Sequence, residues 1–320
     1  MNDFLWPENL LSIFNNFLKK NEIPHTILLA GPQKLGKKTF AKTFAKYLFF
    51  HQNEDFFSFM QKKCQCKNCE KIEKGKFPDF FEISPEKEII SIEKIRELRE
   101  KISFSSFSFY KIALIDEAEK MTREAASAFL KILEEPKGKT IFFLISSFPS
   151  ALLKTILSRS EIIKFHPFPK EILLNFFKNE NEKFYQEKIE LSLGRPALLK
   201  DFFLDENKFL LYNSYIEKMG ELKKMSPEEK MSLGLEIAQN KEKDVIIDLM
   251  KVYFLDVIKI KEGIENVNFE TKKEKMKKAW EKFSLNEIKE DLKKIERVHN
   301  LALFSKVSKE FLFEGLFLSL

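Results

Sequence analysis

A glycine-rich loop between a short apolar strand and a helix constrains the fold of this chain more than any other feature. The apolar run 26–30 leads into the stretch GPQKLGK, in which Gly31, Gly36 and Lys37 hold the spacing G-x4-G-K, and a helical pattern follows. In this context the pattern is typical of a phosphate-binding loop. The glycines let backbone N–H groups close on phosphate oxygens, the helix N-terminus adds positive potential, and the lysine reaches the terminal phosphates.

Short apolar runs alternate with helical patterns through the first 165 residues. Near-continuous apolar runs of this length are typical of strands buried on both faces of a parallel sheet, and apolar spacing near 3.6 residues predicts helices. We therefore expect an α/β domain with a mostly parallel sheet covered by helices. The expected strands are 26–30, 79–83, 111–115, 140–146 and 161–165, and the expected helices are 37–50, 92–102 and 122–135, the last ending before Pro136.

The motif His166-Pro167-Phe168-Pro169 is a rigid break that ends the region of strands. A short helical segment follows it, and from residue 206 onward only long amphipathic helices rich in Lys and Glu are indicated. Ser284 with Glu287 three residues later predicts a capping box in this last part. The length of 320 residues agrees with two domains or more, and we place the divisions at 1–166, 167–205 and 206–320.

The composition excludes several classes of protein. Hydrophobic residues make up 44% and charged residues 32%, so the chain is not intrinsically disordered. Its apolar runs are shorter than the ~20 residues that span a bilayer, and its start lacks a signal-peptide pattern, so we expect a cytoplasmic protein without a membrane partner. The net charge of +6 permits a nucleic-acid partner without requiring one. Only six residues are arginine among 55 basic ones, which favours a geometric need for an arginine that is retained; the alternative is that the six fell at random.

The eighth position of the loop departs from the usual pattern. A Ser or Thr hydroxyl there ligates Mg²⁺, but this chain has Lys38, whose ammonium repels the ion. Thr39 comes one residue later, about 100° further around the helix. We expect that the site has lost normal Mg-nucleotide chemistry, so that ATP and Mg²⁺ bind weakly or not at all. The alternative is that Thr39 serves as the ligand and weak nucleotide binding survives.

A second nucleotide-site motif lies about 80 residues after the loop. The apolar strand 111–115 ends in Asp116 and Glu117, the arrangement in which the first carboxylate holds the metal through water and the second polarises the attacking water. Acidic pairs at strand ends are common, but this distance from a phosphate-binding loop makes the pair specific.

Three further stretches carry a family resemblance. They are 116–122 (DEAEKMT), 129–136 (FLKILEEP) and 152–160 (LLKTILSRS), in that order. Over roughly its first 200 residues the chain resembles the AAA+ clamp-loader subunits of bacterial DNA polymerase III. The short segment before Trp6-Pro7 and the Gly-Lys-Lys form of the loop are similar to the delta prime type rather than the gamma/tau type. Against this, Glu117 is retained, which a subunit that does not hydrolyse ATP would not need.

The resemblance implies a fold and a role. The fold would be an AAA+ P-loop module at 1–166, a small helical lid at 167–205 and an all-α collar at 206–320. The chain would be a subunit of the replicative polymerase complex that loads a ring-shaped sliding clamp onto primed DNA, with gamma/tau and delta subunits as partners. Two other functions stay open: an active ATPase of the gamma/tau type, and a structural AAA+ adaptor not involved in replication.

The resemblance also implies roles for four of the arginines. Arg159, in the Ser-Arg-Ser motif, would reach the ATP of a neighbouring subunit, where a planar, permanently charged guanidinium suits the γ-phosphate; the alternative is a surface ion pair. Arg195 in Gly194-Arg195-Pro196 would face this chain's own nucleotide, or remain as a structural relic. Arg96 and Arg123, near the starts of two helices, would contact DNA phosphates, or are ordinary surface charges.

The three cysteines of the chain lie close together, as Cys64-x-Cys66-x2-Cys69. Relatives in the family carry four zinc-binding cysteines, the last three spaced C-x2-C-x2-C, so Cys64 is one position displaced. His51 lies near the position of the missing cysteine, and three thiolates with one imidazole can bind zinc. The resemblance therefore implies a zinc site in an insertion at 64–69, and the alternative is a group of free thiols in a reducing compartment.

Overall fold

A computed structural model describes residues 4–86, 88–135, 138–177, 184–304 and 307–320. The chain forms two compact units, Met1–Pro167 and Phe168–Leu320. This division falls inside the proline-rich break at 166–169. The predicted further division at residue 205, into lid and collar, lies within the second unit and stays a prediction. Pro136, expected to end a helix, lies outside the described residues.

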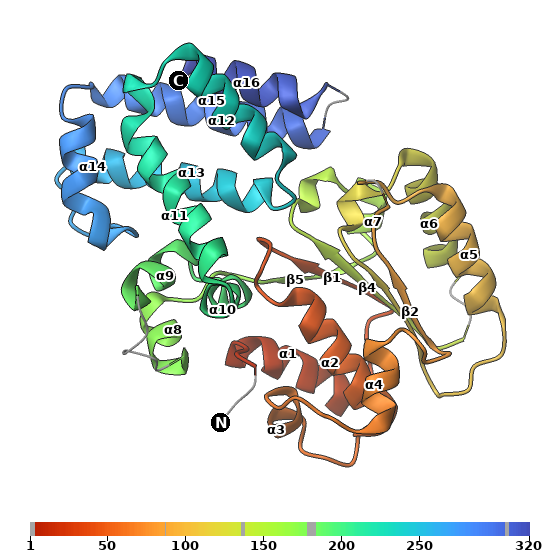
Figure 1. Cartoon of the computed structure of the whole chain (residues 1–320). Helices are drawn as coiled ribbons and strands as arrows, with labels where there is room; N and C mark the ends of the chain where they lie inside the picture. The colour runs from red at the N-terminus through yellow and green to blue at the C-terminus, as the bar shows by residue number, and fades with distance from the viewer. Residues whose placement is uncertain (1–3, 87, 136–137, 178–183, 305–306) are drawn as a thin grey trace. The chain divides into compact units, whose positions relative to one another are not determined.

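The first unit is built on a five-stranded sheet whose strands all pair in parallel, in the order β2-β3-β4-β1-β5. The predicted parallel α/β fold and its five strands are confirmed, with ends that differ by no more than one residue. The central strands are buried on both faces because helices cover both sides of the sheet (Figure 1). The strands are β1 (Thr26–Ala30), β2 (Phe80–Ile83), β3 (Lys111–Ile115), β4 (Thr140–Ser146) and β5 (Glu161–Lys164).

Alternate strand residues feed two separate cores. Along β1, Ile27 and Leu29 pack with α1, α2 and α3, whereas Leu28 and Ala30 pack with α5, α6 and α7. The same alternation on β3 and β4 fills both layers, as the period of two in a strand requires. The helices of this unit are α1 (Glu8–Lys20), α2 (Lys37–Phe50), α3 (Phe56–Met60), α4 (Lys67–Glu73), α5 (Ile92–Ser103), α6 (Arg123–Glu134) and α7 (Lys154–Leu157).

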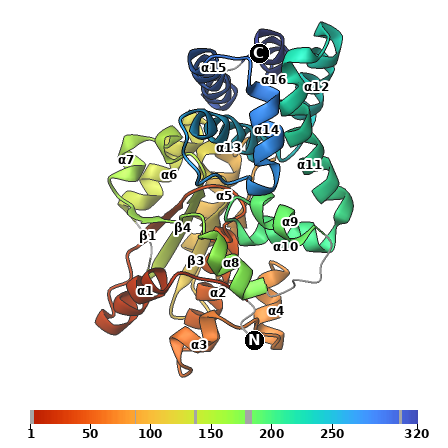
Figure 2. The ribbon, with the colours of Figure 1, turned by 90° about the vertical axis from the view of Figure 1, so that its left-hand side faces the viewer.

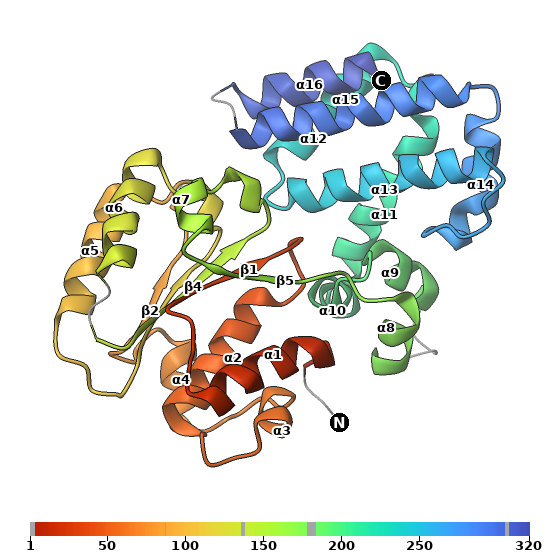
Figure 3. The same cartoon turned by 180° about the vertical axis from the view of Figure 1, so that it is seen from behind.

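The described residues of the second unit form helices and no strand, as predicted. Helices α15 and α16 run side by side, and α12 packs against α16 (Figures 2 and 3). The predicted capping box is present, because Ser284 and Glu287 exchange side-chain and backbone hydrogen bonds, and Ser226 with Glu229 forms a second one. The helices are α8 (Lys170–Phe177), α9 (Tyr185–Leu191), α10 (Pro196–Leu204), α11 (Glu206–Glu221), α12 (Pro227–Gln239), α13 (Lys243–Lys261), α14 (Lys273–Trp280), α15 (Leu285–Phe304) and α16 (Lys309–Ser319).

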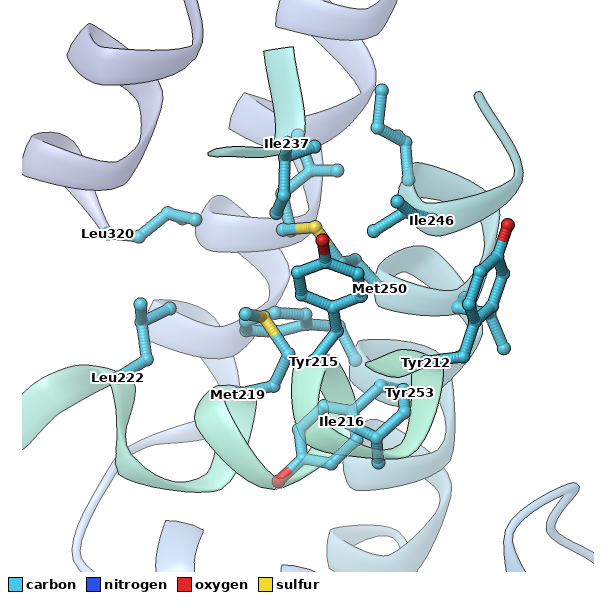
Figure 4. Close-up of a cluster of buried hydrophobic side chains, with 14 of the residues drawn as sticks. Tyr212, Tyr215, Ile216, Met219, Leu222, Ile237, Ile246, Met250, Tyr253 and Leu320 are labelled. Atoms are coloured by element: carbon cyan, nitrogen blue, oxygen red, sulfur yellow. The ribbon is translucent and has the colours of Figure 1, made fainter. Parts of the chain in front are cut away.

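One continuous hydrophobic core holds the second unit together. It runs from Leu198 and Phe202 in α10 to the tyrosines and methionines of α11 and α13, among them Tyr215 and Met250 (Figure 4). The residues of the predicted lid and collar therefore share one core. No helix of the described residues combines the length and the apolar character needed to cross a membrane.

Candidate functional site

The phosphate-binding loop occupies the carboxyl end of β1, and its two glycines are required by close contacts. Gly31 has φ 147°, and a Cβ there would lie 2.2 Å from the Phe165 carbonyl oxygen. Gly36, with φ 83°, caps α2, and a Cβ on it would lie 3.1 Å from the Trp6 ring. Trp6 is held in place by a hydrogen bond of 2.7 Å from its Nε1 to the Met60 carbonyl. The loop therefore has the expected place between strand and helix.

Lys37, the lysine expected to reach phosphates, is buried and turned back onto its own loop. Its Nζ donates to the carbonyl oxygens of Gly31 and Pro32, the latter at 2.7 Å. An ammonium in this position satisfies loop carbonyls instead of phosphate oxygens.

Lys38 contacts the acidic residues at the ends of two neighbouring strands. Its Nζ lies 3.0 Å from Asp116 Oδ2 and 2.6 Å from Glu82 Oε1. Burial lowers the pKa of Lys38, but the hydrogen bonds and charges of these two carboxylates outweigh it, so the pKa is raised overall. Thr39, the alternative metal ligand, is exposed. Lys38 thus stands beside the carboxylate that would hold the metal.

The contact of Lys38 belongs to a larger set of ion pairs along α2, which we call the lysine ladder. Lys42, one turn further along, lies 2.7 Å from Glu82 Oε2, and Lys46, another turn on, pairs with Glu73 of α4. Burial raises the pKa of Glu82, but hydrogen bonds from Lys38 and Lys42 outweigh it and lower the pKa overall. The ladder consists of Lys38, Lys42, Lys46, Asp116, Glu82 and Glu73.

Glu117, the residue expected to polarise water, also has a partner within the chain. It adopts φ 49°, and its Oε2 lies 2.6 Å from Lys120 Nζ. Asp116 accepts the backbone N–H of Glu117 at 3.1 Å. Both carboxylates of the second motif are therefore held by lysines of this chain.

Arg159 follows α7 and lies on the surface of the first unit. Its Nη1 donates to the Thr155 carbonyl at 3.2 Å and its Nη2 to Glu134 Oε1 at 3.1 Å. The side chain is 39% exposed and that of Glu134 is 53% exposed. A pair this exposed contributes about 0–1 kcal/mol, so little free energy holds the guanidinium in place.

Arg96 and Arg123 line the same groove between α5 and α6, which pack together (Figure 1). The groove has a volume of about 510 Å³, and Arg99 and Lys131 line it as well, against one carboxylate, Glu124. All four basic side chains are exposed. The structure therefore brings three of the six arginines to one basic surface.

Arg195 lies in the second unit at the start of α10 and is 3% exposed. Its Nη2 donates to Asp248 Oδ2 of α13 at 2.7 Å. Its Nε and Nη1 have no hydrogen-bond partner among the described residues. Its predicted contact with nucleotide stays a prediction.

His51, Cys64, Cys66 and Cys69 bring their donor atoms together, all within 4.8 Å of one another. From His51 Nε2 the Sγ atoms of Cys69, Cys64 and Cys66 lie at 3.2, 3.5 and 3.7 Å. Ligands of a tetrahedral zinc ion are separated by about 3.5 Å between nitrogen and sulfur, given the usual bond lengths. The four residues therefore fit a metal ion, and the displaced spacing of Cys64 does not prevent its participation.

The groups around the cluster orient the His51 imidazole and shift the pKa values of the thiols. His51 Nδ1 lies 2.5 Å from Glu54 Oε1, which leaves Nε2 directed at the thiols, as in many metal sites. Burial raises the pKa of Cys66, but the backbone N–H of Cys69 and the neighbouring donors outweigh it and lower the pKa to about 6. Burial and the neighbouring thiols raise the pKa of Cys69. Three thiolates at this separation repel one another unless a cation lies between them.

Several members of these sites were not predicted from the sequence. Glu82 is the single charged residue of β2, and a charge within an otherwise apolar strand was the available signal. Arg99 lies three residues after Arg96, on the same face of a helix. Another missed feature is the loop after α5, where Phe104, Phe107 and Phe109 are 70%, 84% and 64% exposed.

A family model described as "DNA polymerase III, delta subunit" matches residues 6–169. The chain belongs to this family. The matched residues cover nearly the whole first unit, including the phosphate-binding loop, the cysteine cluster and Arg159. The predicted α/β fold with a helical C-terminal part agrees with the structure, and the predicted resemblance to delta prime subunits is confirmed by the relatives below.

Curated relatives include DNA polymerase III subunits of both the delta' and the tau/gamma type. The chain is 33% identical over 166 residues to the DNA polymerase III subunit delta' of Bacillus subtilis, covering 51% of this chain and 49% of that one. It is 27% identical over 190 residues to the Escherichia coli delta' subunit, covering 57% and 55%, and 33% identical over 166 residues to a Haemophilus influenzae tau/gamma subunit, covering 51% and 23%. The chain thus spans about half the length of the delta' relatives it matches.

Among solved structures, the chain is similar to a DNA polymerase III gamma subunit-related protein of Thermotoga maritima. The identity is 19% and the TM-score 0.48, and the match covers 96% of this chain and 97% of that one.

Proposed function

We propose that this chain is the delta prime type subunit of a bacterial clamp loader, a cytoplasmic complex that places a sliding clamp on primed DNA. The match of residues 6–169 to the polymerase III family model carries this proposal. Identity alone does not separate the delta prime and gamma/tau types, because both occur among relatives that are 33% identical. The contacts of Lys38 favour delta prime, since its ammonium pairs with Asp116 where an ATPase needs Mg²⁺.

In this function Arg159 acts on a neighbouring subunit. Its guanidinium lies on the surface, where the described residues hold it through an exposed pair with Glu134 and a bond to a backbone carbonyl. Reaching the γ-phosphate of a neighbour's ATP therefore costs little, and the planar fork can stabilise the charge that develops during hydrolysis. This chain would contribute the arginine while its own site does not turn over ATP.

The test is Arg159→Ala in the reconstituted complex of delta prime, gamma/tau and delta subunits. We expect DNA-stimulated ATP turnover at the neighbour's site to fall by about 10³-fold, the usual worth of an arginine supplied in trans, with assembly unchanged. Arg159→Lys should recover little, because an ammonium lacks the fork. Lys154→Ala is the matched control, since it removes an exposed charge from α7. Unchanged turnover in Arg159→Ala would refute the role.

The basic groove between α5 and α6 is the proposed DNA contact. Arg96 and Arg123 were predicted to contact phosphates, and Arg99 and Lys131 line the same groove. Four exposed cations against one carboxylate suit a phosphate backbone, which is recognised by charge rather than by base sequence.

We also propose that the metal of the cluster is zinc. Three sulfur donors and one imidazole are a ligand set typical of a structural zinc site, which has no open position for chemistry. His51, Cys64, Cys66 and Cys69 would hold the ion, and Glu54 would orient the imidazole. The ion would connect the end of α2 to the start of α4 and would take no part in a reaction.

A further inference from the structure

Each charged group of the nucleotide site is engaged by another group of this chain. Lys37 donates to the carbonyls of its own loop, Asp116 is paired with Lys38, and Glu117 is paired with Lys120. In a working site of this type these three would face phosphate, metal ion and attacking water. The site is therefore satisfied without a ligand.

We propose that Lys38 is a tethered cation that replaces the divalent ion of this site. It joins Asp116 at the end of β3 to Glu82 in β2, so this edge of the sheet stays closed without a metal and excludes Mg²⁺. The inference rests on the proposed function, in which this chain does not turn over ATP. It goes beyond that function because it gives Lys38 a structural role, in addition to the loss of a metal-binding hydroxyl at this position.

The position of Lys38 in the sequence and its contacts both support this structural role. It stands at the residue that supplies the metal-binding hydroxyl in a working loop, and it contacts the carboxylate that would bind the same ion. Its Nζ lies within 3.0 Å of two carboxylates, one in β2 and the other directly after β3.

The charge balance of the lysine ladder shows why a cation is needed at the position of Lys38. Three lysines of α2 face three carboxylates, so the ladder is neutral. Without Lys38, three carboxylates would face two lysines, and Asp116 would lose its cation. A divalent ion could then enter, because the carboxylate would be uncompensated and half-buried next to Glu82.

The test compares the full chain with Lys38→Thr, which restores the Gly-Lys-Thr form of the loop. The measurements are thermal unfolding in chelator-free buffer without Mg²⁺ and with Mg²⁺, and binding of Mn²⁺ as a spectroscopic probe. We expect the unaltered chain to have the same Tm in both conditions. Lys38→Thr should unfold about 2–4 °C lower without Mg²⁺, recover in Mg²⁺, and bind Mn²⁺ at least tenfold more tightly than the unaltered chain.

Two controls isolate the effect. Lys42→Thr removes an ion pair to the same Glu82 but leaves Lys38 on Asp116, so it should lose stability without responding to Mg²⁺. Adding Asp116→Asn to Lys38→Thr should abolish the response, because the anchoring carboxylate is gone.

Three outcomes would overturn the proposal. They are a Mg²⁺ response of the unaltered chain that depends on Asp116, a Lys38→Thr variant as stable as the unaltered chain in the absence of Mg²⁺, and a destabilised Lys38→Thr variant that does not respond to Mg²⁺. None of them bears on Arg159, which lies outside the lysine ladder. Failure here is therefore distinguishable from failure of the proposed function, which the ATPase of the complex decides.

Discussion

Helix α2 begins at the phosphate-binding loop and ends at His51, and its two ends satisfy their polar groups in opposite ways. At the first end, Lys37 and Lys38 supply cations from the chain to loop carbonyls and to strand carboxylates. At the other end, one imidazole and three thiols converge, and all four are groups that a metal cation binds. The first end is closed by the protein itself, whereas the donors of the second fit a metal ion.

The difference shows that a sequence motif and a site that fits its ligand can occur one without the other. The loop keeps the glycines and the lysine of a nucleotide site, yet one substitution at position 38 fills the place of the metal. The cysteine cluster has lost the regular spacing of the family, yet its donors still meet at distances that fit a metal ion. Geometry, rather than the motif, decides which end binds a ligand, and the following predictions test this contrast.

Removal of the metal should have the largest effect. Cys69 is fully buried, and we expect Cys69→Ser to lower zinc content from about one equivalent to below half and to cost several kcal/mol, since structural zinc contributes on the order of 10 kcal/mol of binding free energy. A strong chelator should produce the same loss in the unaltered chain. The measurements are metal analysis of purified protein and thermal unfolding.

The control for this substitution is Ile72→Val, which trims a buried side chain of the same helix without touching a donor. It should cost about 1 kcal/mol and leave zinc content unchanged. Less than about half an equivalent of zinc in the unaltered protein would contradict the zinc site and would make the two ends of α2 alike.

Two glycines with positive φ allow the backbone of the phosphate-binding loop to be compared with that of an open turn. Gly31→Ala would place a Cβ 2.2 Å from the Phe165 carbonyl oxygen, which cannot move without breaking the contact between β1 and β5. Gly75, just after α4, has φ 63° and open space around the position of a Cβ. We expect Gly31→Ala to cost on the order of 3 kcal/mol and Gly75→Ala about 1 kcal/mol, measured by urea unfolding. Equal losses would mean that the loop backbone is not tightly held.

The sequence predicted the fold well because its signals are local. Strands that are apolar throughout and helices with a period near 3.6 residues are visible in any short window, and the loop motif marks the carboxyl end of β1. The metal-binding cluster could also be predicted, because its four donors all lie between residues 51 and 69, and thiol and imidazole groups are typical metal ligands.

Contacts between distant segments could not be predicted in the same way. Glu82 meets Lys38 only because β2 lies next to β3 in the sheet, and the strand order cannot be read from spacing. Arg99 joins Arg96 and Arg123 only once α5 is packed against α6. For Arg195 the pairing with Asp248 spans 53 residues and has no local signal.

The smallest expected effect concerns the charge of Glu82. Because the pKa of Glu82 is lowered in the folded protein, its ionised form stabilises the fold above the ordinary value of 4.5, and this contribution is lost as the pH falls through the lower folded value. Glu82→Gln should therefore cost about 1 kcal/mol at pH 7, and the difference from the unaltered chain should vanish in acid. The measurement is urea unfolding of both proteins from pH 7 down to the lowest pH at which the unaltered chain stays folded. A difference that does not shrink as the pH falls would mean that Glu82 acts through packing, and the loop end of α2 would then not be held by charge.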